Sequence, residues 1–152
     1  MTIQSCIFIE TTAYYGGGVL QYSVGGRLAI YNSSFYQTSA IADGGAVCVN
    51  NNNQAVIVQD CTFSSSVAGA NGGAISFGLL NNNITISACR FLNTTSQDGG
   101  AIFIGSRNDF TKIENCLFDL TFASENGGAI FVSSDNTGTV VDHCIFVGSA
   151  AT

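Results

Sequence analysis

The sequence contains no proline and no tryptophan, and only four of its 152 residues are basic. These four, Arg27, Arg90, Arg107 and Lys112, are scattered along the chain, whereas a nucleic-acid surface needs clustered lysine and arginine side chains. The net charge of −6 also argues against binding to anionic membranes. We therefore expect no nucleic-acid partner.

Long hydrophobic runs are absent as well. The N-terminal MTIQSCIFIE has no basic segment followed by a long apolar stretch, and nowhere does the chain approach the roughly 18 uninterrupted apolar residues of a membrane-spanning helix. Neither a signal peptide nor a membrane span is visible. This indicates that a signal was removed or that the sequence is an internal piece of a longer protein.

What is present is a mixture of hydrophobic residues (46%) with glycine, asparagine, serine and threonine. Such a composition is typical of a chain rich in β-strands and turns rather than of a disordered one. The length suits one domain, so we treat residues 1–152 as a single unit.

A repeat of 27 or 28 residues organises the chain. A double-glycine motif begins at residues 16, 44, 72, 99 and 127, and a Cys-x-Phe motif recurs in step with it. The repeated cysteines are Cys6, Cys61, Cys89, Cys116 and Cys144, with Ser33 in the one missing position. The repeated phenylalanines are Phe8, Phe35, Phe63, Phe91, Phe118 and Phe146. Further columns hold Ile or Val three residues before the cysteine and Thr or Ser three residues after the phenylalanine.

Short alternating stretches such as AVIV and AISF, separated by Asn, Ser and Gly clusters, predict three short strands per repeat. One repeat cannot bury its apolar face alone, but stacked repeats place like side chains on one another and share a core. The prediction is a right-handed parallel β-helix of about five coils and roughly 24 Å in length, since adjacent strands lie ~4.8 Å apart. Variable segments such as NNNNQA and GLLNNN are placed in an outward loop.

The double glycines mark one corner of each coil. They are Gly44, Gly45, Gly72, Gly73, Gly99, Gly100, Gly127 and Gly128. We expect at least one glycine of each pair to have a positive φ, or else to be packed so closely that a Cβ would clash.

The repeated GGA[IV] words, each followed by a strand, resemble those of the polymorphic outer-membrane protein family of autotransporter adhesins. The resemblance covers nearly the whole chain, although the FxxN motif of that family is replaced here by Fxx[ST], as in Phe91–Thr94. It implies a predicted right-handed β-helix displayed at a cell surface, with a non-catalytic role in adhesion or scaffolding.

Six cysteines admit a disulfide framework, a metal site or buried thiols. Five share the inward Cys-x-Phe column, and Cys48 lies in another. Column neighbours have parallel side chains, so a disulfide between them would need local distortion. We expect buried free thiols, with a Cys116–Cys144 or Cys61–Cys89 bridge as the alternative. No Cys-x2-Cys pair supports zinc, and we expect no metal or cofactor.

Many β-helices are polysaccharide lyases or hydrolases, which gather two or three carboxylates on one face, often with a basic residue. Asp60, Glu114 and Asp142 flank the cysteine column, but we place them in different coils and slightly different columns with no basic partner nearby. Asp43 and Asp98 lie two coils, about 10 Å, apart. We therefore expect surface carboxylates and no catalytic residues.

The single histidine, His143, directly precedes Cys144. Strand alternation places the two side chains on opposite faces, so they cannot form a catalytic pair. The column before the glycines contains Asp43, Asn71 and Asp98, followed by Asn126, which are potential calcium ligands. Calcium solenoids use a shorter nonapeptide repeat, and these residue types favour turns, so we interpret the column as a corner.

Three sequons, at Asn32, Asn83 and Asn93, can accept N-linked glycans if the chain is secreted by a eukaryotic route. Asn83 is the first candidate, because it falls in the variable loop.

The chain begins and ends in the same part of the coil and shows no capping segment at either end. We expect a non-catalytic, extracellular or cell-surface structural or adhesive solenoid, either a fragment of a longer surface protein or the subunit of a head-to-tail filament. Its expected partners are further copies of itself, joined through uncapped coils, and a glycan or host-surface ligand. The alternative is a β-helix that binds or degrades polysaccharides.

Overall fold

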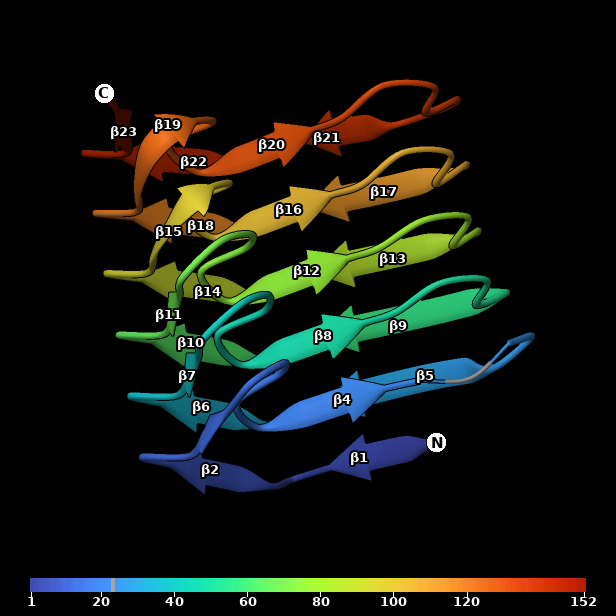
Figure 1. The fold of residues 1–152 in the computed structure, drawn as a ribbon, viewed down its shortest axis with the longest axis horizontal. Coiled ribbons are helices and arrows are strands. Elements are labelled where there is room, and N and C mark those ends of the chain that lie inside the picture. The colour runs from blue at the N-terminus through green and yellow to red at the C-terminus, as the bar shows by residue number, and fades with distance from the viewer. Residues whose placement is uncertain (23) are drawn as a thin grey trace.

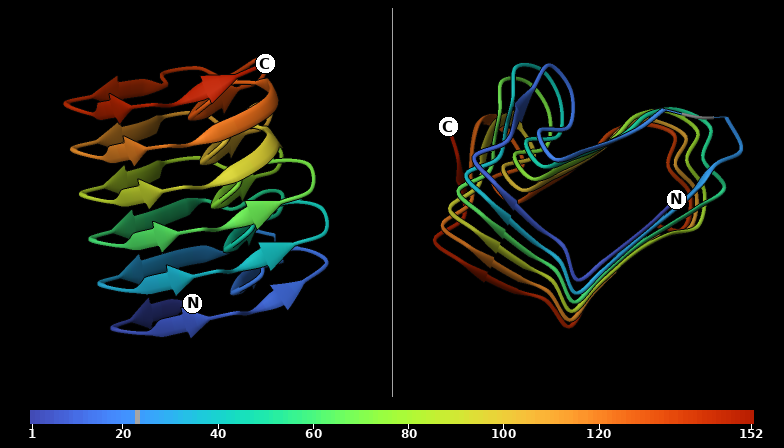
Figure 2. Two further views of the ribbon diagram at one scale, coloured as in Figure 1. Left: turned by 90° about the vertical axis from the view of Figure 1, so that its left-hand side faces the viewer. Right: turned by 90° about the horizontal axis from the view of Figure 1, so that it is seen from below.

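The structure, a computed structural model, describes residues 1–22 and 24–152 as a stack of flat coils built from parallel strands (Figure 1). Each coil contributes one strand to each of four sheets, and the chain winds around the axis in a right-handed sense (Figure 2). The described residues contain no helix, and so none long and apolar enough to cross a membrane.

The four sheets are named A to D in the order in which the chain visits them. Sheet A comprises β1 (Thr2–Gln4), β5 (Arg27–Tyr31), β9 (Ala55–Gln59), β13 (Ile84–Ser87), β17 (Thr111–Glu114) and β21 (Val140–Asp142). Sheet B comprises β2 (Ile7–Ile9), β6 (Ser34–Tyr36), β10 (Thr62–Ser64), β14 (Arg90–Leu92), β18 (Leu117–Asp119) and β22 (Ile145–Val147). Sheet C comprises β3 (Thr12–Ala13), β7 (Ser39–Ala40), β11 (Val67–Ala68), β15 (Thr95–Asp98), β19 (Phe122–Asn126) and β23 (Ala150–Ala151). Sheet D comprises β4 (Val19–Gln21), β8 (Val47–Val49), β12 (Ile75–Phe77), β16 (Ile102–Ile104) and β20 (Ile130–Val132).

The predicted right-handed parallel β-helix of about five coils is confirmed, but the expectation of three strands per coil is wrong. Each coil has four, because the segment after the Cys-x-Phe motif forms the strands of sheet C. Several of these strands have only two residues, such as Val67–Ala68, too few for an alternating pattern to reveal.

Like residues lie on like residues throughout the core. In sheet A, Ile30 pairs with Val58 and Val58 with Ile86, and all three are fully buried. Apolar side chains of every coil join one continuous core cluster. A single 28-residue coil has too little apolar surface to fold alone, so the stability of each coil depends on its neighbours.

The corners on either side of sheet B place residues in the left-handed region in every coil. The residue before each Cys position has a φ between 45° and 54°: Ser5, Asn32, Asp60, Ala88, Asn115 and His143. The residue after each sheet B strand has a φ between 51° and 58°: Glu10, Gln37, Ser65, Asn93, Leu120 and Gly148. This backbone costs a non-glycine residue about 1–2 kcal/mol. Residues as different as Ala88 and Leu120 adopt it, so the stacking of the corners imposes the conformation.

The double glycines form the corner that leads into sheet D, and the two glycines of a pair meet different demands. Gly72 has a φ of +65°. At Gly73 an added Cβ would lie 2.1 Å from the carbonyl oxygen of Gly100 in the next coil. The first glycine is therefore needed for its backbone conformation and the second for the close approach of two coils.

The turn from sheet D to sheet A was expected to be an outward loop, and this expectation is wrong for part of the turn. Its asparagines Asn53, Asn81 and Asn108 are fully buried and point inward. The turns that project furthest from the rod connect sheet C to sheet D in the first three coils (Figure 2). The chain can bury this polar turn because each asparagine bonds to the backbone, as described below.

Candidate functional site

The phenylalanine column forms one continuous stack along the rod. Successive rings from Phe8 to Phe146 have centroids 4.6–5.0 Å apart and planes within 9° of parallel. Phe35, Phe63, Phe91 and Phe118 are fully buried, whereas Phe146, on the last coil, is 49% exposed. The ring spacing equals the spacing of strands in a sheet, so the register of the backbone and that of the rings are set together.

The cysteines of the Cys-x-Phe column lie at the corner between sheets A and B, and all six cysteines of the chain are free thiols. Cys61, Cys89 and Cys116 are buried. Each thiol donates to a backbone carbonyl two residues earlier; Cys89 Sγ lies 3.2 Å from the oxygen of Ser87. Hydrogen bonds with the thiols of Cys116 and Cys61, together with burial, hold the pKa of Cys89 well above its ordinary value. The hydrogen bond with Cys89 in turn lowers the pKa of Cys61 and of Cys116, so the column is a ladder of thiols joined by hydrogen bonds.

Cys48 lies on the outer face of sheet D, not in the core. Its neighbours Val47 and Val49 are fully buried in the core, and Cys48 points the opposite way, yet it is only 6% exposed. Burial, and to a smaller extent the charge of Asp43, raises the pKa of Cys48 to about 12.

Hydroxyl groups pair between coils at the start of sheet C. The Oγ atoms of Thr38 and Ser66 lie 2.9 Å apart, and Thr121 donates to Ser149 at 2.8 Å. These bonds run parallel to the rod axis.

The Asx column before the double glycines is also paired between coils. The side-chain Nδ2 of Asn71 donates to Asp43 Oδ1 at 2.7 Å, and Asn126 donates to Asp98 in the same way at 2.8 Å. Among the described residues, no group of three or more His, Cys, Asp or Glu side chains is placed to hold a metal ion. The carboxylates of this column act as hydrogen-bond acceptors at a corner.

Sequence reasoning missed the buried asparagine column. Asn53, Asn81, Asn108 and Asn136 recur at spacings of 28, 27 and 28, the same period as the glycines. Asn108 Nδ2 donates to the carbonyl oxygens of Gly78 and Gly105, and its Oδ1 accepts from the Asn81 N–H, each at 2.7 Å. The amide thereby replaces the backbone bonds that a turn cannot make for itself.

The carboxylates near the cysteine column are arranged differently from expectation in two respects. Glu114 and Asp142 are direct partners in neighbouring strands, so they share one column. Lys112 Nζ lies 2.7 Å from Glu114 Oε2, so a basic partner is present. The hydrogen bond and charge of Glu114 raise the pKa of Lys112. Asp60 lies elsewhere, at the corner position.

His143 belongs to the corner rather than to a strand, so the expected strand alternation does not apply to it. Its φ is +49°, its side chain is 77% exposed, and its Nδ1 lies 2.8 Å from Asp142 Oδ2. Cys144 turns toward the core and donates to the carbonyl of Ile113 at 3.7 Å. The two side chains diverge from the corner.

All three sequon asparagines are exposed and have a positive φ. Asn32 and Asn93 occupy the two corners beside sheet B, and Asn83 ends the turn from sheet D to sheet A. Asn83 Nδ2 makes a long hydrogen bond of 3.3 Å to the carbonyl of Gln54. Each amide is therefore accessible from solvent.

No protein-family model, no curated protein and no solved structure matches the chain, so its fold and its surface chemistry are the basis for assigning a function.

Proposed function

We propose that the chain is a non-catalytic structural and adhesive solenoid of an extracellular or cell-surface protein, whose terminal coils stack against further coils of the same kind. The observation that carries this proposal is the chemical identity of successive coil interfaces. Each interface is made of the same stacked phenylalanine, aliphatic column and corner glycine, so any coil can serve as the neighbour of any other.

The two end faces of the rod are complementary in this sense. The first coil presents Ile3 and Phe8, and the last presents Val141 and Phe146, which belong to the same two columns. A coil that covers either face, whether it comes from a longer chain or from a second copy, continues both columns. Stacking of a second copy generates a head-to-tail filament, because the contact joins different surfaces and does not close.

Two features support display outside the cell. The GGA[IV] words that resemble those of autotransporter adhesins lie at the stacked corners of sheet D, and the sequon asparagines lie on the exposed surface. A surface role in turn implies a glycan or a host-surface ligand as partner.

Sedimentation velocity and negative-stain electron microscopy of the chain over a range of concentrations test the stacking. We expect rods that lengthen with concentration at constant width. Phe146→Asp places a charge on the end face and should leave monomers, whereas Ile145→Asp changes the outward neighbour in β22 and should leave assembly intact. A wild-type chain that stays monomeric at high concentration, or equal effects of the two variants, would refute the proposal.

A second candidate function is polysaccharide degradation, favoured by the grouping of Lys112, Glu114 and Asp142 on the outer face of sheet A. Glycoside cleavage uses a pair of carboxylic side chains, one as acid and one as base or nucleophile. Incubation with neutral and acidic polysaccharides, followed by a reducing-end assay, decides it. Cleavage that is lost in Glu114→Gln would replace the non-catalytic proposal, and an absence of cleavage removes the candidate.

A further inference from the structure

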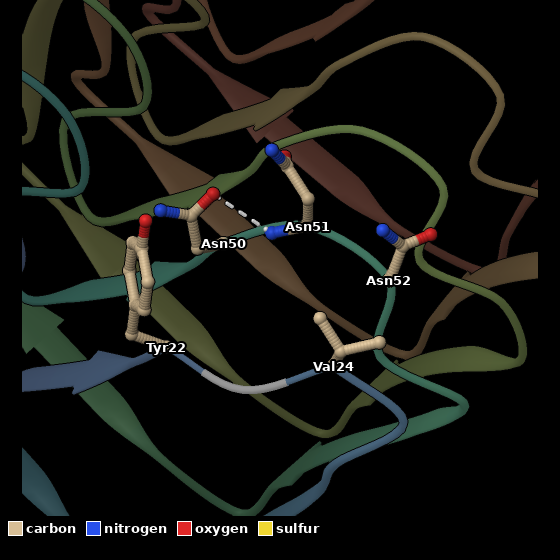
Figure 3. A pocket seen from close by; sticks show the side chains of 5 residues that line it. All are labelled: Tyr22, Val24, Asn50, Asn51 and Asn52. Carbon is tan, nitrogen blue, oxygen red and sulfur yellow. Dashed lines mark hydrogen bonds between the residues drawn. The ribbon is translucent and has the colours of Figure 1, made fainter.

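A groove runs along the outer face of sheet D, beside β8 and β12. It has two lobes, with volumes of about 380 Å³ and 340 Å³, which share Tyr22, Asn50 and Asn51 in their walls. Volumes of this size lie within the range of about 300–1,000 Å³ of sites for small organic ligands. Figure 3 shows the first lobe, with Tyr22 and Val24 on one coil and Asn50, Asn51 and Asn52 on the next, and with the ring of Tyr22 beside the Asn50 side chain.

The floor of the second lobe is formed by Cys48 and Ser76, which occupy the outward positions of β8 and β12. These side chains are only 6% and 3% exposed. In the coils to either side, the same column holds large apolar side chains, Leu20 and Phe103. The hollow therefore exists because two small residues interrupt a column of large ones.

Two tyrosines form an aromatic wall. Tyr22 is 78% exposed and Tyr15 is 43% exposed, although exposed aromatic surface is unfavourable in water. The ring of Tyr15 packs edge-on against that of Tyr14, with centroids 4.8 Å apart. An amphipathic ring held at the side of a hollow can pack against the C–H face of a flat ligand.

The asparagines of the adjacent coil supply hydrogen-bond donors. Asn50 Oδ1 accepts from the backbone N–H of Asn51 at 2.8 Å, and Asn51 Oδ1 accepts from the N–H of Leu79 at 2.7 Å. Both oxygens are used internally, which fixes the two amides. Within the described residues, the NH₂ groups of Asn50, Asn51 and Asn52 have no protein acceptor, so they are available to a ligand.

The groove carries little charge. Asp43 is the one charged residue among those that line the two lobes, and its Oδ1 already accepts two bonds from Asn71. None of the four basic side chains lines the described part of either lobe. A polyanion would therefore meet no counter-charge there, whereas a neutral ligand rich in hydroxyl groups would meet donors and aromatic faces.

We propose that this groove binds a neutral oligosaccharide. The rings of Tyr22 and Tyr15 pack against the C–H faces of successive sugar residues, and the amides of Asn50–Asn52 donate to their hydroxyl groups. The two lobes hold adjoining sugars of one chain. This inference rests on the adhesive part of the proposed function and gives it a ligand class and a site.

The test is titration of the full chain with maltotriose, cellotriose and triacetylchitotriose, followed by calorimetry and by the side-chain amide signals in ¹H–¹⁵N NMR spectra. Trigalacturonate and choline serve as anionic and cationic probes. We expect a dissociation constant below about 1 mM for at least one neutral trisaccharide, with shifts at Asn50–Asn52. Tyr22→Ala should weaken binding roughly tenfold, while Tyr22→Phe retains the ring and most of the affinity.

Tyr36→Ala is the matched control, because Tyr36 is a 45% exposed tyrosine on sheet B, away from the groove. The proposal is overturned if no neutral trisaccharide binds, if only trigalacturonate or choline binds, or if Tyr22→Ala binds as the wild type does. Sedimentation of the same samples separates the two proposals: failure of binding with intact filaments refutes the groove alone, and monomeric wild type refutes the stacking.

Discussion

Replacement of Asn108 by alanine tests how much the buried asparagine column contributes to stability. The Asn108 side chain is fully buried, and its amide pairs the carbonyl oxygens of Gly78 and Gly105 and the N–H of Asn81, each at 2.7 Å. Alanine leaves the carbonyl oxygen of Gly78 and the N–H of Asn81 buried without a partner, whereas the oxygen of Gly105 keeps its bond from Asn136 Nδ2 at 2.9 Å. Each orphaned group costs about 1–3 kcal/mol, so we expect the free energy of unfolding to fall by about 2–6 kcal/mol. This is a large fraction of the ~5–15 kcal/mol of a typical domain.

Urea unfolding followed by far-ultraviolet circular dichroism measures the loss. Asn82→Ala is the matched control, since Asn82 lies in the corresponding turn of the preceding coil, is half-buried and accepts one long bond of 3.3 Å from the Asp109 N–H. We expect the control to lose less than about 1 kcal/mol. If the two variants lose the same amount, the buried amide does not hold the turn together and the reasoning fails.

Two further predictions concern the corner glycines and the outer thiol. Gly73→Ala puts a Cβ 2.1 Å from the Gly100 carbonyl oxygen and should cost about 2–4 kcal/mol through lost backbone bonds, measured by urea unfolding. Gly25→Ala, in open space at φ +71°, should cost only the ~1–2 kcal/mol of left-handed strain; equal losses would contradict close packing. Because burial raises the pKa of Cys48 from 9.0 to about 12, the folded chain keeps a proton that the unfolded chain releases. The contribution of the protonated thiol to stability is fully present below pH 9 and is lost as the pH rises through 12. The melting temperature of the wild type should therefore fall relative to that of Cys48→Ala above pH 9. A difference between the two melting temperatures that does not change with pH would contradict this reasoning.

The columns were predictable from sequence because each one repeats a residue type at a fixed period. Phe63 and Gly72 recur in almost every coil, and like side chains on one line can only mean that the coils stack. The corner glycines were predictable for the same reason, because a corner that recurs in every coil must have the same backbone conformation in each. The repeated Cys-x-Phe and double-glycine motifs therefore sufficed to predict the fold and the register of the coils.

The asparagine column, the ion pair on sheet A and the groove were not predicted, because none of them is marked by an obvious repeated motif. Asn81 lies in an Asn-rich segment that reads as a solvated loop by composition, and only its period of 27 or 28 indicates that it is a stacked position. The Lys112–Glu114 ion pair follows from strand alternation, which puts residues two apart on one face. No repeated motif marks the groove, because it lies where Cys48 and Ser76 interrupt the outward column of large apolar residues on sheet D. Tyr22, which lines the groove, comes from a different coil.

The hydrogen bonds that connect the coils run along the rod, and this direction sets how the molecule responds to a pulling force. Tension between its ends loads the four ladders of one coil interface together and successive interfaces in series. The rod should therefore yield by peeling one coil at a time rather than by shearing as a whole. Each event would release 27 or 28 residues, or about 90 Å of extended chain, so a stretched rod should lengthen in nearly equal steps.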